Sequence, residues 1–121
     1  NMSITFWCPD APTTRVQPYP EFDPEFWDEV STLPSCNFSY LNGPRLLRQL
    51  GLPDECGELA PEALPDVIAR LAPMRAEIVE RARQEYCTGG GEQCLSELRR
   101  MDNLHAVLEA GVAHQQRVAW G

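Results

Sequence analysis

The sequence contains no lysine, so arginine supplies all 10 of its basic residues, and 18 acidic residues outnumber them. The resulting formal net charge of −8 disfavours direct binding to nucleic acid, because contact with phosphates requires a basic surface. No stretch approaches the roughly 20 consecutive apolar residues of a transmembrane helix, so we expect no contact with a membrane. The first seven residues lack the basic segment and apolar run of a secretory signal, which predicts a cytoplasmic protein.

The 5 cysteines form no Cys-x-x-Cys pair. In a reducing compartment such cysteines usually act as small buried apolar residues. Zinc requires four donors at a workable spacing, which Cys87, Cys94 and His105 do not supply, so we expect no metal and no cofactor. Two alternatives stay open, a disulfide between Cys87 and Cys94 and a catalytic pair of His105 with one of these thiols.

The size and composition indicate one globular domain. The chain has 121 residues, of which 43% are apolar and 23% charged, as in ordinary globular proteins. The 11 prolines and 8 glycines predict short, often interrupted elements. We expect a single domain (1–121) with an arm at 9–35 and a helical part at 42–116.

Apolar residues at helical spacing dominate the second half of the chain. Gly51 is placed to end the first of these helices in a left-handed conformation. Pro73 is expected to break or kink the helix before it and can start the next one. The arginines of the last two helices, Arg99 among them, are expected to pair with acids of these helices, several of them at i, i+3 or i, i+4. The expected partners are Glu77, Glu80, Glu85, Glu97 and Asp102. The expected helices cover about 44–50, 61 or 65 to 72, 73–87 and 92–115.

Residues rich in β-formers predict short strands at 4–7, 36–40 and 117–120, and residues 52–60 form a turn-rich connector. The last two helices are joined by a short glycine-rich turn, so they should pack as an antiparallel hairpin. The expected fold class is α+β, mainly α, with this helical hairpin and a small sheet that pairs the N-terminal and C-terminal strands.

The segment 19–30 interleaves acids with aromatic residues and contains no basic residue. Asp23 and Pro24 predict the start of a short helix over 23–30. One interpretation is a docking arm, in which aromatic side chains anchor a protein partner and carboxylates attract its basic surface. The other is an amphipathic helix that packs on the core and exposes an acidic face. The candidate binding residues are Tyr19, Glu21, Phe22, Asp23, Glu25, Phe26, Trp27, Asp28 and Glu29.

Four short motifs lie between residue 42 and the last residue. They are Asn-Gly-Pro-Arg-Leu-Leu-Arg-Gln-Leu-Gly-Leu at 42–52, Cys-Gly-Glu-Leu at 56–59, Leu-Pro at 64–65 and the ending Val-Ala-Trp-Gly at 118–121. Together they resemble a family of small uncharacterised bacterial proteins with an Asn-led helix that ends in Leu-Gly-Leu and a Trp-Gly terminus. The resemblance covers about half of the chain, excludes the arm, and implies no active site.

These patterns favour a non-enzymatic protein-protein interaction module, with no catalytic residues. All of the excess negative charge lies in residues 1–66, which suits a partner with a basic surface. A sharper version is an acidic inhibitor or regulator of a nucleic-acid-binding protein, whose carboxylates imitate phosphates. The alternatives are a small Cys/His-dependent enzyme and a structural subunit that associates with copies of itself.

Overall fold

The computed structural model describes residues 4–9, 14–30, 36–38, 43–52, 56–86 and 92–121. It is mostly helical, with a small sheet, and confirms the expected fold class. No helix in these ranges is long and apolar enough to cross a membrane. The elements in chain order are β1 (Ile4–Trp7), β2 (Thr14–Val16), β3 (Asp28–Val30), β4 (Cys36–Phe38), α1 (Gly43–Gln49), β5 (Gly57–Leu59), the 3-10 turn η1 (Pro61–Ala63), α2 (Leu64–Tyr86), α3 (Glu92–His114) and β6 (Val118–Trp120).

The main sheet has the strand order β4-β1-β6-β5, with every pair antiparallel. The N-terminal and C-terminal strands pair as expected, with Phe6 opposite Trp120. Alternation along β1 places Ile4 and Phe6 in the core. The connector expected at 52–60 contains the edge strand β5, where Gly57 lies against the Trp120 ring, so that prediction was incomplete.

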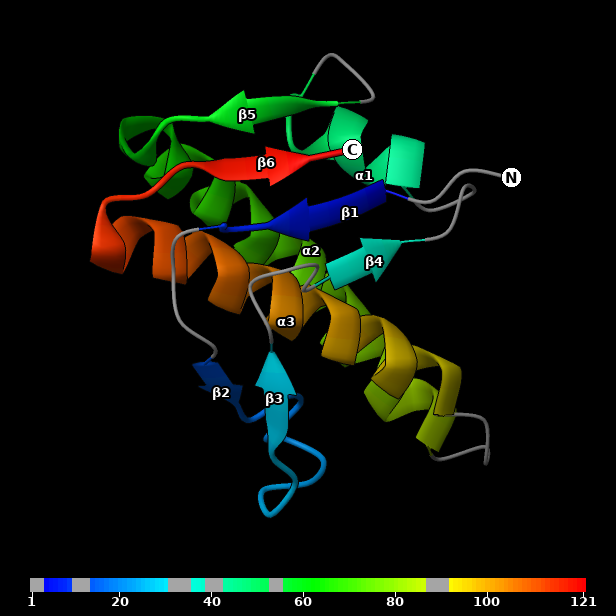
Figure 1. Cartoon of the computed structure of the whole chain (residues 1–121). Helices are drawn as coiled ribbons and strands as arrows, with labels where there is room; N and C mark the ends of the chain where they lie inside the picture. The colour runs from blue at the N-terminus through cyan, green and yellow to red at the C-terminus, as the bar shows by residue number, and fades with distance from the viewer. Residues whose placement is uncertain (1–3, 10–13, 31–35, 39–42, 53–55, 87–91) are drawn as a thin grey trace.

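Two long helices pack against each other and against one face of the sheet (Figure 1). The expected antiparallel hairpin is confirmed, since the start of α2 at Leu64 lies beside Gly111 near the end of α3. The break expected at Pro73 is wrong, because α2 continues through this proline. Leu71 before Pro73 is buried in the main core and Val79 after it is buried in a second apolar cluster, so packing holds both halves of α2 and compensates for the lost backbone hydrogen bond.

The short helix α1 begins and ends close to the predicted positions. Gly51 follows it with a φ of +75°, which confirms the left-handed ending. The amide of Leu52 then donates to the Leu47 carbonyl, and Arg70 of α2 donates to the Leu50 carbonyl at 2.6 Å. The first bond closes the end of α1, and the bond from Arg70 fastens this end to the helical hairpin.

The helix expected over 23–30 is wrong. Residues 28–30 form β3, which pairs antiparallel with β2, so Arg15 lies opposite Glu29. Between the strands the chain makes tight turns, in which the amides of Phe22 and Asp23 both donate to the Tyr19 carbonyl. Strand pairing and contacts to distant helices replace the local helix, which an eight-residue segment cannot stabilise alone. We call residues 14–30 the β2–β3 arm; Figure 1 shows it below the sheet, next to α3.

Candidate protein-interaction site

The β2–β3 arm contains every candidate residue of the sequence analysis, and aromatic packing holds it on the helices. Tyr19 and Phe22 are partly buried against a second apolar cluster formed by Val79, Ala82, Cys94 and Leu98 of α2 and α3. The Tyr19 ring also stacks on Phe26, with ring centroids 5.7 Å apart. These aromatic residues therefore cover the end of the helical hairpin, and only part of the predicted aromatic set stays available to a partner.

Arg75 of α2 links the arm to both long helices. Its guanidinium donates to Glu21 Oε2 and Oε1 at 2.6 and 2.9 Å, and to Asp102 Oδ1 and Oδ2 at 2.5 and 3.0 Å. Asp102 Oδ2 also accepts the amide hydrogen of Tyr19, at 2.8 Å. We call Arg75, Glu21 and Asp102 the arginine clasp. The planar guanidinium suits this geometry, because each edge can meet one carboxylate with two parallel bonds.

The clasp makes Glu21 a much stronger acid than an ordinary glutamate. The hydrogen bonds from Arg75 lower the pKa of Glu21 from 4.5 to about 2. A carboxylate with a depressed pKa in the folded state stabilises that state above its unfolded pKa and loses this effect as the pH falls through the folded pKa. The contribution of Glu21 should therefore be complete above pH 4.5 and disappear towards pH 2.

This pH dependence can be measured with Glu21→Gln. We expect the parent to be more stable than this variant at neutral pH, because the variant loses the charged contacts with Arg75. The two urea-unfolding free energies should converge as the pH falls from 4.5 to about 2. A constant difference across this window would contradict the assignment. Glu62→Gln, at an exposed glutamate outside the arm, is the matched control and should follow the parent at every pH.

A second ion pair fastens the other end of the arm. Asp28 Oδ2 accepts hydrogen bonds from Arg99 Nε at 2.7 Å and from Asn103 Nδ2 at 3.3 Å. The Arg99 guanidinium also lies 5.4 Å from the centroid of the Phe26 ring. The sequence analysis expected Arg99 to pair with an acid of the long helices, whereas it binds Asp28 of the arm. Asp102 pairs with Arg75 of α2 and also accepts the Tyr19 amide hydrogen of the arm. The only signal in the sequence was the lack of any basic residue in 19–30.

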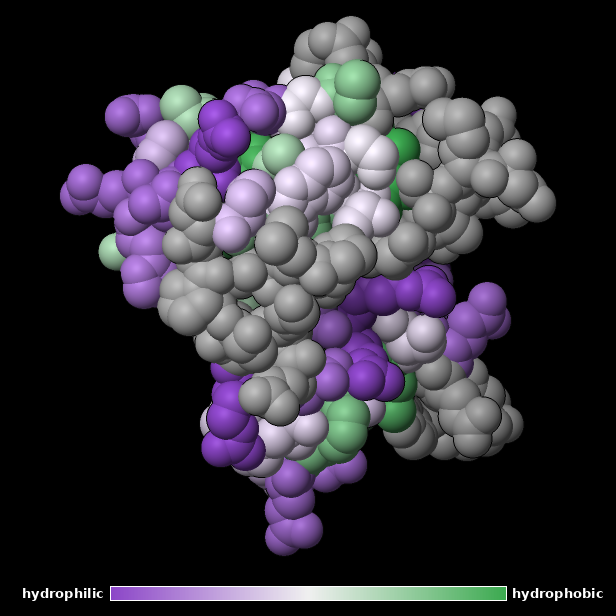
Figure 2. Space-filling view, viewed as in Figure 1, coloured by the Kyte–Doolittle hydropathy of each residue, from purple (hydrophilic) through white to green (hydrophobic). Residues whose placement is uncertain are grey.

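Three of the exposed residues of the arm, Asp23, Glu25 and Trp27, are called the tip. Asp23 and Glu25 are exposed, and Asp23 Oδ1 accepts the Glu25 amide hydrogen at 3.2 Å. Trp27 is 49% exposed, and among the described residues no other large hydrophobic side chain is exposed. The Arg15 guanidinium lies 4.7 Å from the centroid of its ring and fixes its orientation. The tip thus combines an accessible indole with two carboxylates on a fastened arm. In Figure 2 strongly hydrophilic residues surround the arm, whereas the outer face of the sheet is pale.

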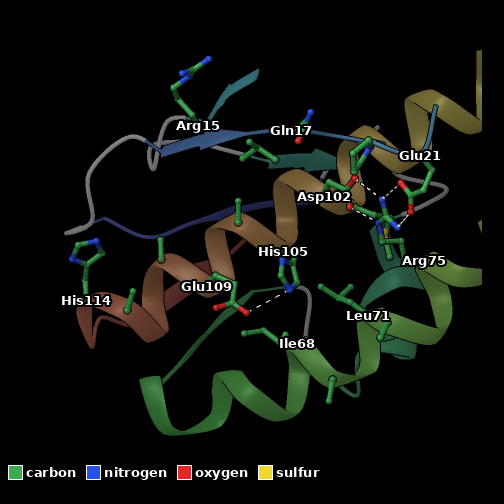
Figure 3. Close-up of a pocket in the computed structure, with 18 residues that line it drawn as sticks. Arg15, Gln17, Glu21, Ile68, Leu71, Arg75, Asp102, His105, Glu109 and His114 are labelled. Atoms are coloured by element: carbon green, nitrogen blue, oxygen red, sulfur yellow. Dashed lines mark hydrogen bonds and ion pairs between the residues drawn. The ribbon is translucent and has the colours of Figure 1, made fainter. Parts of the chain in front are cut away.

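A groove of about 900 Å³ runs between the arm and the two long helices. Arg15 and His114 lie at one end and the arginine clasp lies at the other (Figure 3). The floor consists of Ile68, Leu71 and the small side chains of several alanines, and His105 at its edge lies 3.4 Å from Glu109. Glu21 and Asp102 are already paired with Arg75, and Glu109 lies beside His105, so the rest of the described lining of this groove is mainly apolar.

The environment of Cys94 does not favour a role as a nucleophile. Cys94 is buried, and its Sγ donates to Glu85 at 3.1 Å. Burial first, and then the bond to Glu85, raise the pKa of this thiol, which disfavours the reactive thiolate. His105 is eleven residues further along α3, about 16 Å away along the axis, so Cys94 cannot pair with it. Cys87 lies outside the described residues, and within them no group of three or more metal-ligating side chains occurs.

The chain was compared with family models, curated proteins and solved structures. None of the three comparisons found a match. The function must therefore be inferred from the geometry of the arm itself.

Proposed function

We propose that this protein is a non-enzymatic interaction module that binds a protein partner through the tip of the β2–β3 arm. The exposure of Trp27 carries the proposal, because it is an indole left in solvent inside the acidic segment. Tryptophan is enriched among the residues that dominate binding energy at protein interfaces. Asp23 and Glu25 on the same tip favour a partner whose apolar pocket has a basic rim.

The way the arm is held also supports this function. The arginine clasp, the Asp28–Arg99 pair and the stacking of Tyr19 on Phe26 order the arm before any partner arrives. Pre-ordering lowers the entropy that binding must overcome, so a small contact can still have useful affinity. The free thiols of Cys8, Cys56 and Cys94 fit a reducing compartment, and we place the module in the cytoplasm.

Inhibition of a basic nucleic-acid-binding protein is a special case of this proposal. It requires several carboxylates free to imitate phosphates. Among the arm acids whose side chains the structure describes, Glu21 and Asp28 are bound to Arg75 and Arg99, so Asp23 and Glu25 remain for a partner. Two carboxylates support electrostatic steering towards a basic surface better than they support imitation of a nucleic-acid backbone.

The experiment is photo-crosslinking in a lysate of the source organism, with a photoreactive phenylalanine analogue at position 27 and, as control, at exposed position 113. We expect a specific adduct at position 27 only. The adduct should disappear with Asp23→Asn and Glu25→Gln, and at about 1 M salt, where the screening length is roughly 3 Å. The charge-matched control Glu62→Gln and Asp66→Asn removes two exposed carboxylates elsewhere and should leave the adduct unchanged. No adduct, or equal adducts at both positions, would contradict the proposal.

A stability measurement accompanies this test. The Asp23→Asn, Glu25→Gln variant should change the unfolding free energy by less than about 1 kcal/mol, because both side chains are exposed. Urea unfolding checks this expectation. A larger loss would assign the tip a structural role.

A further inference from the structure

A small cleft opens between α1, α2 and α3. Its apolar floor is formed by Leu46, Met74, Ile78 and Met101. Its volume is about 180 Å³, which is below the roughly 300–1,000 Å³ of pockets for drug-sized ligands. The cleft therefore suits a single large side chain better than a free small molecule. Methionine sulfur also makes favourable contacts with aromatic rings, so this floor fits an aromatic occupant.

The rim of the cleft is basic, although the chain as a whole is acidic. Arg45, Arg81 and Arg100 line it, together with Glu77 and Glu97. Arg81 Nη2 lies 2.9 Å from Glu97 Oε2. Among the described lining residues, three arginines accompany two glutamates, so the formal charge of the rim is +1 in a protein whose net charge is −8.

The cleft and the tip are separate surfaces of one molecule. Glu97, Arg100 and Met101 line the cleft, whereas Arg99 and Asn103 bind the arm, so the cleft and the arm flank α3. Trp27, Asp23 and Glu25 are exposed and do not line the cleft of their own molecule. The arm is held in this position by Arg75 and Arg99. In this conformation a contact between tip and cleft joins two molecules.

From this arrangement we infer that the cleft receives the tip of a second copy of this chain, an inference that rests on the proposed function. Trp27 would enter the methionine-lined floor, and Asp23 and Glu25 would meet the arginines of the rim. The indole of the tip matches the apolar floor of the cleft, and the two carboxylates match the arginines of its rim. This match is the reason for inferring a second copy of the chain as the partner. Arg15 already orders the indole on one face, so little side-chain freedom is lost when its other face is covered.

The contact is head to tail, because the two surfaces differ. Each copy offers a tip to one neighbour and a cleft to another, so association continues into a ring or a chain of molecules. A twofold dimer would instead bury the same surface on both copies. The stoichiometry of mixed variants therefore distinguishes this proposal from any symmetric dimer.

Sedimentation velocity over a range of protein concentrations tests the inference with two variants. Trp27→Ala removes the tip but keeps the cleft, and the Arg45→Glu, Arg81→Glu variant reverses the rim but keeps the tip. We expect the parent to gain mass with concentration and each variant alone to associate at least about tenfold more weakly. An equimolar mixture should form dimers and nothing larger, because only one complementary pair of surfaces remains.

Two further samples exclude misfolding and general charge effects. A chain with Asp23→Arg, Glu25→Arg, Arg45→Glu and Arg81→Glu exchanges the charges of both surfaces and should associate with itself again. Glu62→Gln with Asp66→Asn should behave like the parent. Matching urea midpoints among the variants show that the fold is intact.

The outcomes separate this inference from the function on which it rests. A parent that stays monomeric at every concentration, or a mixture that stays monomeric, overturns self-docking. If position 27 still forms its specific adduct with a different protein, the interaction module stands and only the choice of partner is wrong. Association that persists in both single variants assigns it to another surface and also overturns self-docking.

Discussion

Arg75→Ala should destabilise the protein by about 3 kcal/mol, far more than an ordinary surface arginine. The substitution removes hydrogen bonds to two carboxylates, and hydrogen bonds to charged groups contribute about 1.5–3 kcal/mol. It also leaves Asp102, whose side chain is only 12% exposed, without its cation. Loss of one partner from a poorly hydrated ion pair is costly, because the remaining charge lacks compensation.

Urea unfolding of Arg75→Ala measures this loss, and two substitutions serve as controls. Arg83→Ala removes an arginine that is 59% exposed and lies 4.0 Å from Glu80, so its effect should stay within about 0.5 kcal/mol. Arg75→Lys keeps the charge but cannot form paired bonds to two carboxylates, so its stability should be intermediate. Equal stabilities for Arg75→Ala and Arg83→Ala would show that the clasp does not hold the arm.

Hydrogen exchange locates the damage in Arg75→Ala. The Tyr19 amide donates to Asp102, and Tyr19 has a φ of +38°, which an L-residue rarely adopts. Loss of Arg75 leaves fewer contacts to hold that conformation, so the amides of residues 19–26 should exchange faster than in the parent. Amides in the middle of α3 should keep their protection as long as the protein stays folded.

Gly111→Ala should destabilise the protein by about 2 kcal/mol, although alanine is the better helix former. In an exposed helix this substitution would gain about 1 kcal/mol. A Cβ atom at position 111 would lie 2.6 Å from Leu64 Cδ1, 2.9 Å from Val118 Cγ2 and 3.0 Å from the Gln116 carbonyl oxygen. These contacts are too close, and overpacking of a core typically costs about 1–3 kcal/mol.

A double-mutant cycle tests the cause of the Gly111→Ala effect. Leu64→Ala removes the nearest obstacle, so Gly111→Ala should cost less in that background than in the parent. Ser96→Ala, at an exposed position of α3, is the control for helix propensity and should be neutral or slightly stabilising. A stabilising effect of Gly111→Ala in the parent would mean that α3, α2 and β6 do not meet as closely as described.

The sequence by itself determined the elements whose signals are local. Period-3.6 apolar residues located the long helices, a glycine ended α1 in the left-handed conformation, and β-formers located β1, β4 and β6. The pairing of β1 with β6 and the helical hairpin also followed, because apolar faces must be buried and a short connection makes neighbouring helices antiparallel. The acidic and aromatic composition of the arm was likewise evident from the residues alone.

Only the tertiary structure decided the conformation of that arm and which of its side chains remain exposed. The turns and strands at 14–30 depend on Arg75, Arg99 and Asp102, which lie far along the chain and carry no local signal for this contact. Pro73 stays inside α2 for a similar reason, because packing outweighs a local preference against helix. The same long-range contacts divide the described side chains of the acidic segment into partly buried, paired and exposed ones. They leave Trp27 exposed to solvent, because the exposure of each side chain depends on which side of the arm packs against the helices.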